Sequence, residues 1–177
     1  MPRDPVADRL IAALGLEPLP GEGGFFRQTW RSDTASAIFF LLTDDDFSAL
    51  HRLDQDEIWH FYAGASVEHV QVDPRDGTRR VVRMGPDVLA GERPQVHVPA
   101  GVWQGARLAA ERVPTRASDS QGETERVANS LSGRPGFALL GCTVSPPWSE
   151  RGFTLGVRDE LVRVFPEHAT WVAALTR

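Results

Sequence analysis

The segment 48–64, SALHRLDQDEIWHFYAG, carries three side chains that could bind a metal ion or move a proton. They are His51, Glu57 and His60, and they stand among large apolar residues. An imidazole and a carboxylate brought close together can hold a divalent cation, or they can act as a base and an acid in proton transfer. The spacing of His51 and Glu57 is compatible with both chemistries, so the residue pattern leaves both open.

The strand expected over 56–63 decides which of these side chains meet. Side chains alternate between the two faces of a strand. Glu57 therefore shares a face with Trp59 and Phe61, whereas His60 lies on the opposite face. We expect Glu57 and His51 to be catalytic groups of a pocket, with Trp59 and Phe61 as its walls.

Two glutamines are expected to add polar groups to this pocket. The segment 98–104, VPAGVWQ, follows the first segment along the chain and ends in Gln104, and Gln95 opens the short strand just before it. An amide that points into a barrel needs hydrogen-bond partners. Gln95 and Gln104 are therefore candidate substrate-binding residues.

The strand expected over 25–31, FFRQTWR, offers a third set of candidates. Arg27 and Thr29 share one face, and Phe26 and Gln28 share the other. A buried arginine would need a carboxylate or an anionic ligand beside it. Arg27 and Thr29 are candidate substrate-binding residues if their face is the inner one, and solvated residues of an edge strand if it is not.

Short strands separated by turns are the elements that must position these residues. The helix expected over 4–15 has an N-capping residue in Asp4 and a glycine at its end, and two more helices are expected over 158–165 and 166–175. Strands placed between helices at the two ends of a chain indicate a single all-β barrel or sandwich over 1–177. The expected strands are 25–31, 37–43, 50–53, 56–63, 66–73, 78–84, 95–98, 102–109, 136–144 and 153–157.

Composition excludes several classes of function. The net charge is −5 and no basic cluster stands out, so neither duplex nucleic acid nor a membrane is an expected partner. No apolar run is long enough to cross a bilayer. The single cysteine, Cys142, is expected in core packing and fits a reducing cytoplasm. The polar segment 111–135 is expected to be a flexible insertion.

The segment 51–64 resembles the first motif of the cupin superfamily, His-x-His, three or four residues, Glu, six residues, Gly. His51, Glu57 and Gly64 match it, and Leu53 stands where the second histidine belongs. The segment 98–104 resembles the second motif, Pro-x-Gly-x-x-His, with Gln104 in place of the histidine. The resemblance is closer still to the cupin-5 family, whose signature segments are similar, in order, to EGGFFRQTWRS, IFFLLT, HRLDQDEIWHFYAG, the Pro94-Gln95 step, VPAGVWQ, LLGCTVSP and DELVRVFPEHATWVAAL.

The resemblance implies a double-stranded β-helix, or jelly roll, with a pocket in its core and a homodimeric assembly. It also implies four metal ligands, His, His, Glu and His, in the members that bind metal. His51 and Glu57 fill two of these positions, whereas Leu53 cannot ligate and Gln104 is at best a weak neutral donor. We therefore expect no cofactor, with a divalent metal on His51, Glu57 and Gln104 as the alternative.

Three functions remain open from the sequence. The first is a metal-independent isomerase or epimerase acting on a small polar or anionic metabolite, in which His51 abstracts a proton and Glu57 orients or protonates the substrate. The second is a metal-dependent oxygenase or isomerase, and the third is a small-molecule-binding protein without catalysis. In the first, the substrate-binding residues are Arg27, Thr29, Trp59, Phe61, Gln95 and Gln104.

Overall fold

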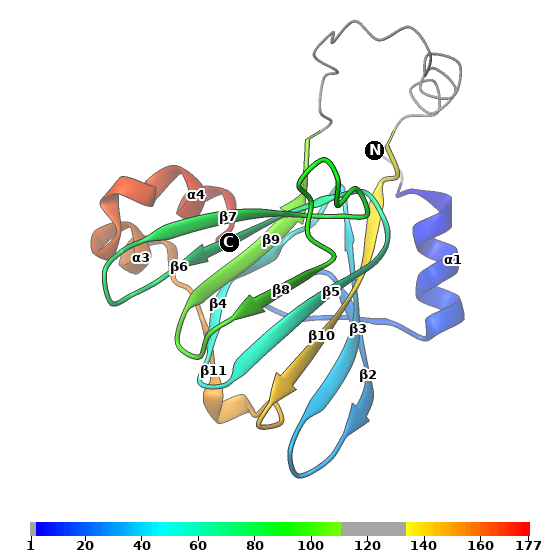
Figure 1. Cartoon of the computed structure of the whole chain (residues 1–177), viewed down its shortest axis with the longest axis horizontal. Coiled ribbons are helices and arrows are strands. Elements are labelled where there is room, and N and C mark those ends of the chain that lie inside the picture. The colour runs from blue at the N-terminus through cyan, green and yellow to red at the C-terminus, as the bar shows by residue number, and fades with distance from the viewer. Residues whose placement is uncertain (1–2, 111–133) are drawn as a thin grey trace, which may run out of the picture.

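The computed structural model describes residues 3–110 and 134–177 of the chain (Figure 1). The insertion expected over 111–135 lies outside the described residues except for its last two positions. No helix in the described part of the chain is long and apolar enough to cross a membrane.

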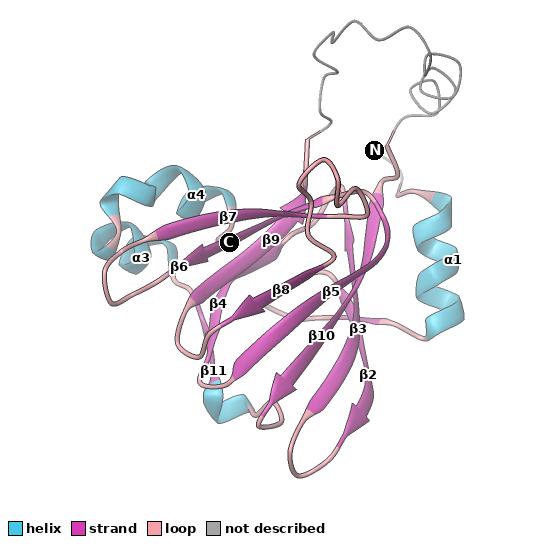
Figure 2. Ribbon diagram, viewed as in Figure 1, coloured by secondary structure: helices cyan, strands magenta, loops and turns pink. Residues whose placement is uncertain are grey.

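Two antiparallel sheets face each other and form the body of the molecule (Figure 2). The six-stranded sheet has the order β1-β2-β3-β10-β5-β8, and the five-stranded sheet has the order β11-β4-β9-β6-β7. The expected all-β fold with terminal helices is confirmed, and the ten expected strands are present within two residues of their bounds. The strands are β1 (Glu17–Pro18), β2 (Phe25–Arg31), β3 (Ser36–Thr43), β4 (Ser48–Leu53), β5 (Asp56–Gly64), β6 (Val67–Val72), β7 (Arg79–Met84), β8 (Gln95–Val98), β9 (Trp103–Leu108), β10 (Phe137–Ser145) and β11 (Phe153–Leu155).

The helices lie on the outer faces of the two sheets. Helix α1 (Pro5–Leu14) begins where the Asp4 carboxylate accepts a hydrogen bond from the backbone of Val6, and it ends at Gly15 in the left-handed conformation. It packs on the six-stranded sheet through a cluster that includes Leu41 and Phe137. The chain closes with α3 (Arg158–Val164), a 3-10 turn at Pro166–His168 and α4 (Ala169–Ala174). The helix expected over 166–175 is thus shorter than predicted.

The main core lies between the two sheets and sets the direction of the functional side chains. Alternate residues of β5 point into it, so Trp59 is almost fully buried while Tyr62 is half exposed. A second core forms where α3 and α4 cover the outer face of the five-stranded sheet, around Leu50, Val70 and Trp103. The space between the sheets, rather than the helical layer, contains the candidate site.

Candidate functional site

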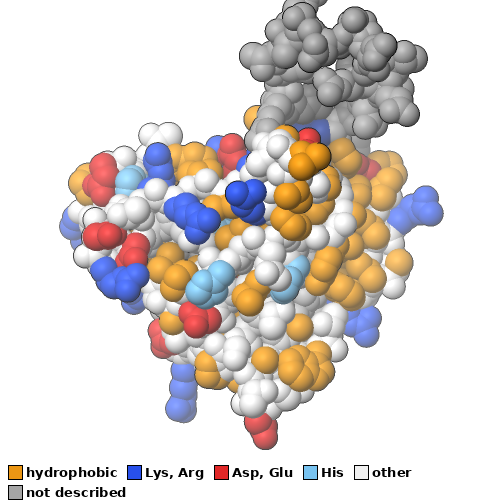
Figure 3. Space-filling view, in the orientation of Figure 1, with side chains coloured by type: hydrophobic (Ala, Val, Ile, Leu, Met, Phe, Trp, Pro, Cys, Tyr) orange, Lys and Arg blue, Asp and Glu red, His pale blue; other side chains and the backbone are white. Residues whose placement is uncertain are grey.

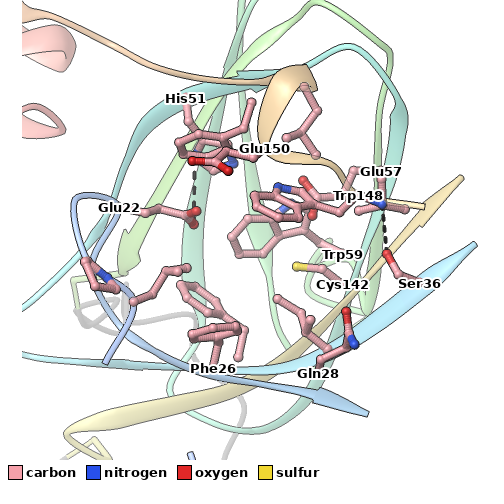
Figure 4. Close-up of a pocket in the computed structure, with 17 residues that line it drawn as sticks. Glu22, Phe26, Gln28, Ser36, His51, Glu57, Trp59, Cys142, Trp148 and Glu150 are labelled. Atoms are coloured by element: carbon pink, nitrogen blue, oxygen red, sulfur yellow. Dashed lines mark hydrogen bonds and ion pairs between the residues drawn. The ribbon is translucent and has the colours of Figure 1, made fainter. Parts of the chain in front are cut away.

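A cavity of about 380 Å³ opens at one end of the space between the sheets. The side chains that converge on it come from both sheets, from the loop before β2 and from the segment after β10 (Figure 4). Most of its wall is apolar or aromatic, with a few ionisable groups among the apolar side chains. The lining residues are Leu19, Pro20, Glu22, Phe26, Gln28, Ser36, Ile38, Phe40, His51, Leu53, Glu57, Trp59, Cys142, Val144, Trp148, Glu150 and Phe153.

His51 lies on β4, almost fully buried, with its ring stacked on Phe153 at a centroid distance of 5.4 Å. Its Nδ1 is 2.8 Å from the carbonyl oxygen of Ala49 and 3.8 Å from a carboxylate oxygen of Glu22. A carbonyl oxygen can only accept, so Nδ1 must donate the hydrogen bond. In the neutral ring the lone pair is therefore on Nε2, which is the nitrogen able to take up a proton.

Glu57 lies on β5 and is 5% exposed. Its Oε2 accepts a hydrogen bond of 2.5 Å from Nε2 of Gln104 on the facing strand β9, and Gln104 Oε1 accepts one of 2.8 Å from the Trp59 indole. Because an indole N–H only donates, Trp59 fixes which end of the Gln104 amide faces Glu57. Gln104 is not a lining residue itself, so its expected contact with substrate is replaced by this contact with Glu57. Burial raises the pKa of Glu57, and the nearby Glu22 charge adds to this whereas His51 opposes it.

Cys142 on β10 is a member of the main core, as expected, and it also lines the cavity beside Glu57. Burial raises the pKa of its thiol well above the ordinary value, and the Glu57 carboxylate raises it further. A thiol in this setting stays protonated and is a poor nucleophile. Cys142 therefore acts as a neutral neighbour of Glu57.

Glu22 is a site residue that the sequence interpretation missed. It lies in the Pro/Gly-rich loop before β2, where its carboxylate accepts a 2.8 Å hydrogen bond from the Ser48 hydroxyl. Its backbone oxygen accepts from Ala49, and the Arg177 guanidinium holds the same loop at Gly21 and Glu22. The available signal was a glutamate between glycines, but the contacts that bury it come from distant parts of the chain.

Gly23 positions this loop, and its replacement by alanine is expected to displace Glu22. The residue has φ +99°, and a Cβ atom there would collide with the Arg177 guanidinium and the Phe47 carbonyl oxygen. We expect Gly23→Ala to destabilise the protein by ~2–4 kcal/mol in urea unfolding, the sum of backbone strain and steric displacement.

Gly101→Ala is the matched control for Gly23→Ala. Gly101 has φ +80° but no atom near the position of the added Cβ, so only the backbone strain applies. Equal losses of unfolding free energy in the two variants would show that the close approach of Arg177 and Phe47 does not position the loop.

Four predicted substrate-binding residues lie away from the cavity. Phe26 and Gln28 are the inward residues of β2, so the prediction for Arg27 and Thr29 is corrected: Arg27 donates to the Leu14 carbonyl oxygen at the end of α1, and Thr29 donates to Ala37. Gln95 is exposed beside His60, because Val96 and Val98 are the inward residues of β8. Phe61 packs against the main core away from the cavity.

The outer face of the six-stranded sheet contains His60, the other candidate histidine, and also His97. Figure 3 shows hydrophobic side chains gathered on this side of the molecule, and Tyr62 is among the exposed ones. The ring of His60 stacks on Tyr62, and its Nε2 is 3.1 Å from the Thr143 hydroxyl. His97 is exposed and 3.5 Å from Asp56. The expectation from strand alternation that His60 faces away from Glu57 is thus confirmed.

The residues present do not fit a four-ligand metal site. Leu53 lines the cavity with an aliphatic side chain, and the carbonyl oxygen of Gln104 is already engaged by Trp59. Within residues 3–110 and 134–177, no group of three or more His, Cys, Asp or Glu side chains is arranged to hold a metal ion. His51 and Glu57 are brought to one cavity, whereas both the expectation of no cofactor and the alternative of a divalent metal stay predictions.

Comparisons with known proteins agree with the two-sheet fold. The family model Cupin_5, described as cupin superfamily (DUF985), matches residues 8–156. A crystal structure of a protein from Shewanella oneidensis is 33% identical, with 100% of this chain and 99% of that chain covered and a TM-score of 0.79. A hypothetical protein from Leishmania major is 28% identical over 96% and 98% of the two chains, also at 0.79. No curated protein matches the chain.

More distant solved structures share the fold alone. Oxalate decarboxylase from Bacillus subtilis is 12% identical and covers 90% of this chain and 37% of its own length, with a TM-score of 0.54. At this identity the similarity describes the arrangement of the two sheets. It carries no information about the chemistry of the cavity.

Proposed function

This chain belongs to the Cupin_5 family of the cupin superfamily, and we propose that it is a metal-independent acid–base enzyme of the isomerase or epimerase type. The observation that supports this most is that His51 and Glu57, an imidazole and a carboxyl group on the two facing sheets, line one cavity. Nδ1 of His51 is committed to a carbonyl oxygen, which leaves Nε2 as the base, and burial favours the protonated form of Glu57, which is the acid.

The proposed reaction moves a proton on a carbon next to a carbonyl group. Nε2 of His51 takes the proton from this carbon, and Glu57 gives its own proton to the carbonyl oxygen as negative charge develops there. In an isomerisation, the protonated His51 returns its proton to the neighbouring carbon of the enol. In an epimerisation, a solvent water protonates the other face of the carbon and His51 releases its proton to solvent. In both reactions Glu57 recovers its proton from a hydroxyl oxygen of the enol. His51 and Glu57 return to their starting states, so no cofactor is required for this sequence.

Three features of the cavity support this chemistry. The surrounding aromatic and aliphatic residues exclude water, which strengthens each hydrogen bond inside. The Trp59–Gln104–Glu57 chain of hydrogen bonds fixes the position of the acid before substrate arrives. The Ala49 carbonyl does the same for the base. Acid and base are therefore preorganised on rigid strands.

Proton exchange with solvent tests the proposal on a panel of candidate compounds. Small α-hydroxy, α-amino and keto compounds are incubated with the protein in D₂O, and deuterium incorporation is followed by mass spectrometry and NMR. We expect at least one compound that also raises the melting temperature to gain carbon-bound deuterium. If compounds bind and stabilise the protein but none exchanges, the non-catalytic binding function is favoured instead.

A further inference from the structure

We infer that the cavity binds a substrate with a positively charged ammonium group on a small, partly apolar framework. This inference names a ligand class for the proposed enzyme. It rests on the proposed function only in calling that ligand a substrate. It replaces the anionic metabolite that the sequence suggested, because that expectation depended on Arg27, which lies outside the cavity. Three features of the cavity favour an ammonium ligand: its charges, its aromatic wall and the free carboxylate oxygen of Glu22.

The ionisable groups of the cavity are predominantly acidic. Glu22, Glu57 and Glu150 all line it, and His51 is the one basic side chain among the described lining residues. The chain has no lysine, and none of the described arginines lines the cavity. An anion moved from water into such a space would face three carboxyl groups and have only the His51 ring as a counter-charge, whereas a cation would be attracted by the carboxylates.

Aromatic rings form much of the remaining wall. A cation beside such rings gains electrostatic attraction from their faces, and the gain grows when water is excluded. The same rings suit the apolar part of a ligand. A cavity wall that combines carboxylates with aromatic rings binds an ammonium group more tightly than a neutral hydroxyl group of the same size. The aromatic lining residues are Phe26, Phe40, Trp59, Trp148 and Phe153.

Glu22 is the carboxylate best placed to receive the ammonium group. Its Oε1 accepts from the Ser48 hydroxyl, but no described residue donates a hydrogen bond to its Oε2. Figure 4 shows Glu22 and Glu57 reaching into the cavity from different elements, with His51 near Glu22. A substrate ammonium at Glu22 would leave the neighbouring part of the molecule facing His51 and Glu57.

Three probes of the same size and different charge test the inference: benzylammonium, benzyl alcohol and benzoate. Their dissociation constants are measured by isothermal titration calorimetry and by quenching of tryptophan fluorescence, since Trp59 and Trp148 line the cavity. We expect benzylammonium to bind ~10-fold more tightly than benzyl alcohol, and benzoate to bind more weakly than both. The Glu22→Gln variant should reduce the preference for benzylammonium over the alcohol to less than ~3-fold.

Glu160→Gln is the matched control, because Glu160 is exposed on α3 and remote from the lining residues. It should keep the wild-type preference. Near-ultraviolet circular dichroism of Glu22→Gln establishes that the loop and barrel stay folded. If Glu22→Gln does not fold, the neighbouring Glu150→Gln variant takes its place, and it should also weaken the preference.

Two results would overturn the inference: benzoate binding as tightly as benzylammonium, or no saturable binding of benzylammonium to the wild-type protein. Neither depends on turnover, so either can occur while deuterium exchange still supports acid–base catalysis on another class of substrate. Conversely, a clear cation preference without exchange on any ammonium compound would retain the ligand class and reject the enzymatic function.

Discussion

The Glu57→Gln variant is expected to lose turnover by ~10²–10⁴-fold on whichever compound shows proton exchange with the wild-type protein. An amide can accept the hydrogen bond from Gln104 in place of the carboxylate, so the Trp59–Gln104 geometry is retained. It cannot transfer a proton to the substrate. The loss should therefore appear in kcat much more than in KM, because binding does not require the transfer.

The stability of this variant should change in the opposite direction to its activity. Burial raises the pKa of Glu57 above its ordinary 4.5, so at pH values above about 4.5 the unfolded chain has lost a proton that the folded protein keeps. Fewer protons on the unfolded state mean that stability falls as pH rises from about 4.5 through the folded pKa. Glu57→Gln removes this loss, and urea unfolding at pH 8 should show a variant at least as stable as wild type.

The kinetic measurement and the unfolding measurement can each contradict this prediction independently. Full turnover in Glu57→Gln would show that Glu57 is not the acid. Low turnover together with a large loss of unfolding free energy at pH 8 would show a structural role instead. The Glu160→Gln variant controls for the removal of one negative charge, and we expect it to change neither measurement.

The alternation of side chains predicted the inner face of a strand correctly where the pattern was one-sided. On β5, Glu57, Trp59 and Phe61 all point inward, and the prediction of this face is confirmed. On β2 both faces mix aromatic and polar residues, so alternation divides the strand into two faces but does not indicate which face points inward. The choice is made by α1, whose last turn supplies the carbonyl oxygen that holds Arg27 outside.

Two further differences have distinct physical causes. Gln95 belongs to the strand QVHV, in which the two valines are the apolar positions, and the pattern itself assigns Gln95 to the outer face. Strand alternation therefore predicts an exposed Gln95, and the expectation of an inward amide with hydrogen-bond partners is wrong for this residue. Glu22 is different, because Ser48, Ala49 and Arg177 bury it from far along the chain. Contacts of that kind cannot be derived from local patterns.

A second large effect is expected from His69, a histidine on β6 that points into the main core beside Trp59. It is completely buried, its ring contacts the Trp59 ring at 4.9 Å, and neither ring nitrogen has a hydrogen-bond partner among the described residues. Burial lowers the pKa of His69 from 6.5 to about 3, and the nearby His51 contributes in the same direction. The folded protein therefore keeps this ring neutral at pH values where the unfolded chain protonates it.

This difference makes His69 a source of acid instability. Between pH 6.5 and about pH 3 the unfolded chain binds one proton more than the folded protein, so stability falls as pH decreases across this range. A shift of this size corresponds to about 5 kcal/mol when the range has been crossed. His69→Leu removes the titrating group while keeping a side chain of similar volume against Trp59. The variant should therefore lose less unfolding free energy than wild type as pH decreases across this range, by about the same 5 kcal/mol when the whole range has been crossed.

Urea unfolding of wild type and His69→Leu at several pH values from about 7 to about 4 measures this effect. At pH 7 the variant should be as stable as wild type or more stable, because it no longer buries ring nitrogens without hydrogen bonds. As pH decreases, the difference in unfolding free energy should grow in favour of the variant. The control is His97→Leu, the same substitution at an exposed histidine. Parallel pH curves for wild type and His69→Leu would contradict a neutral buried ring, because they would mean that His69 binds its proton equally well in the folded and the unfolded protein.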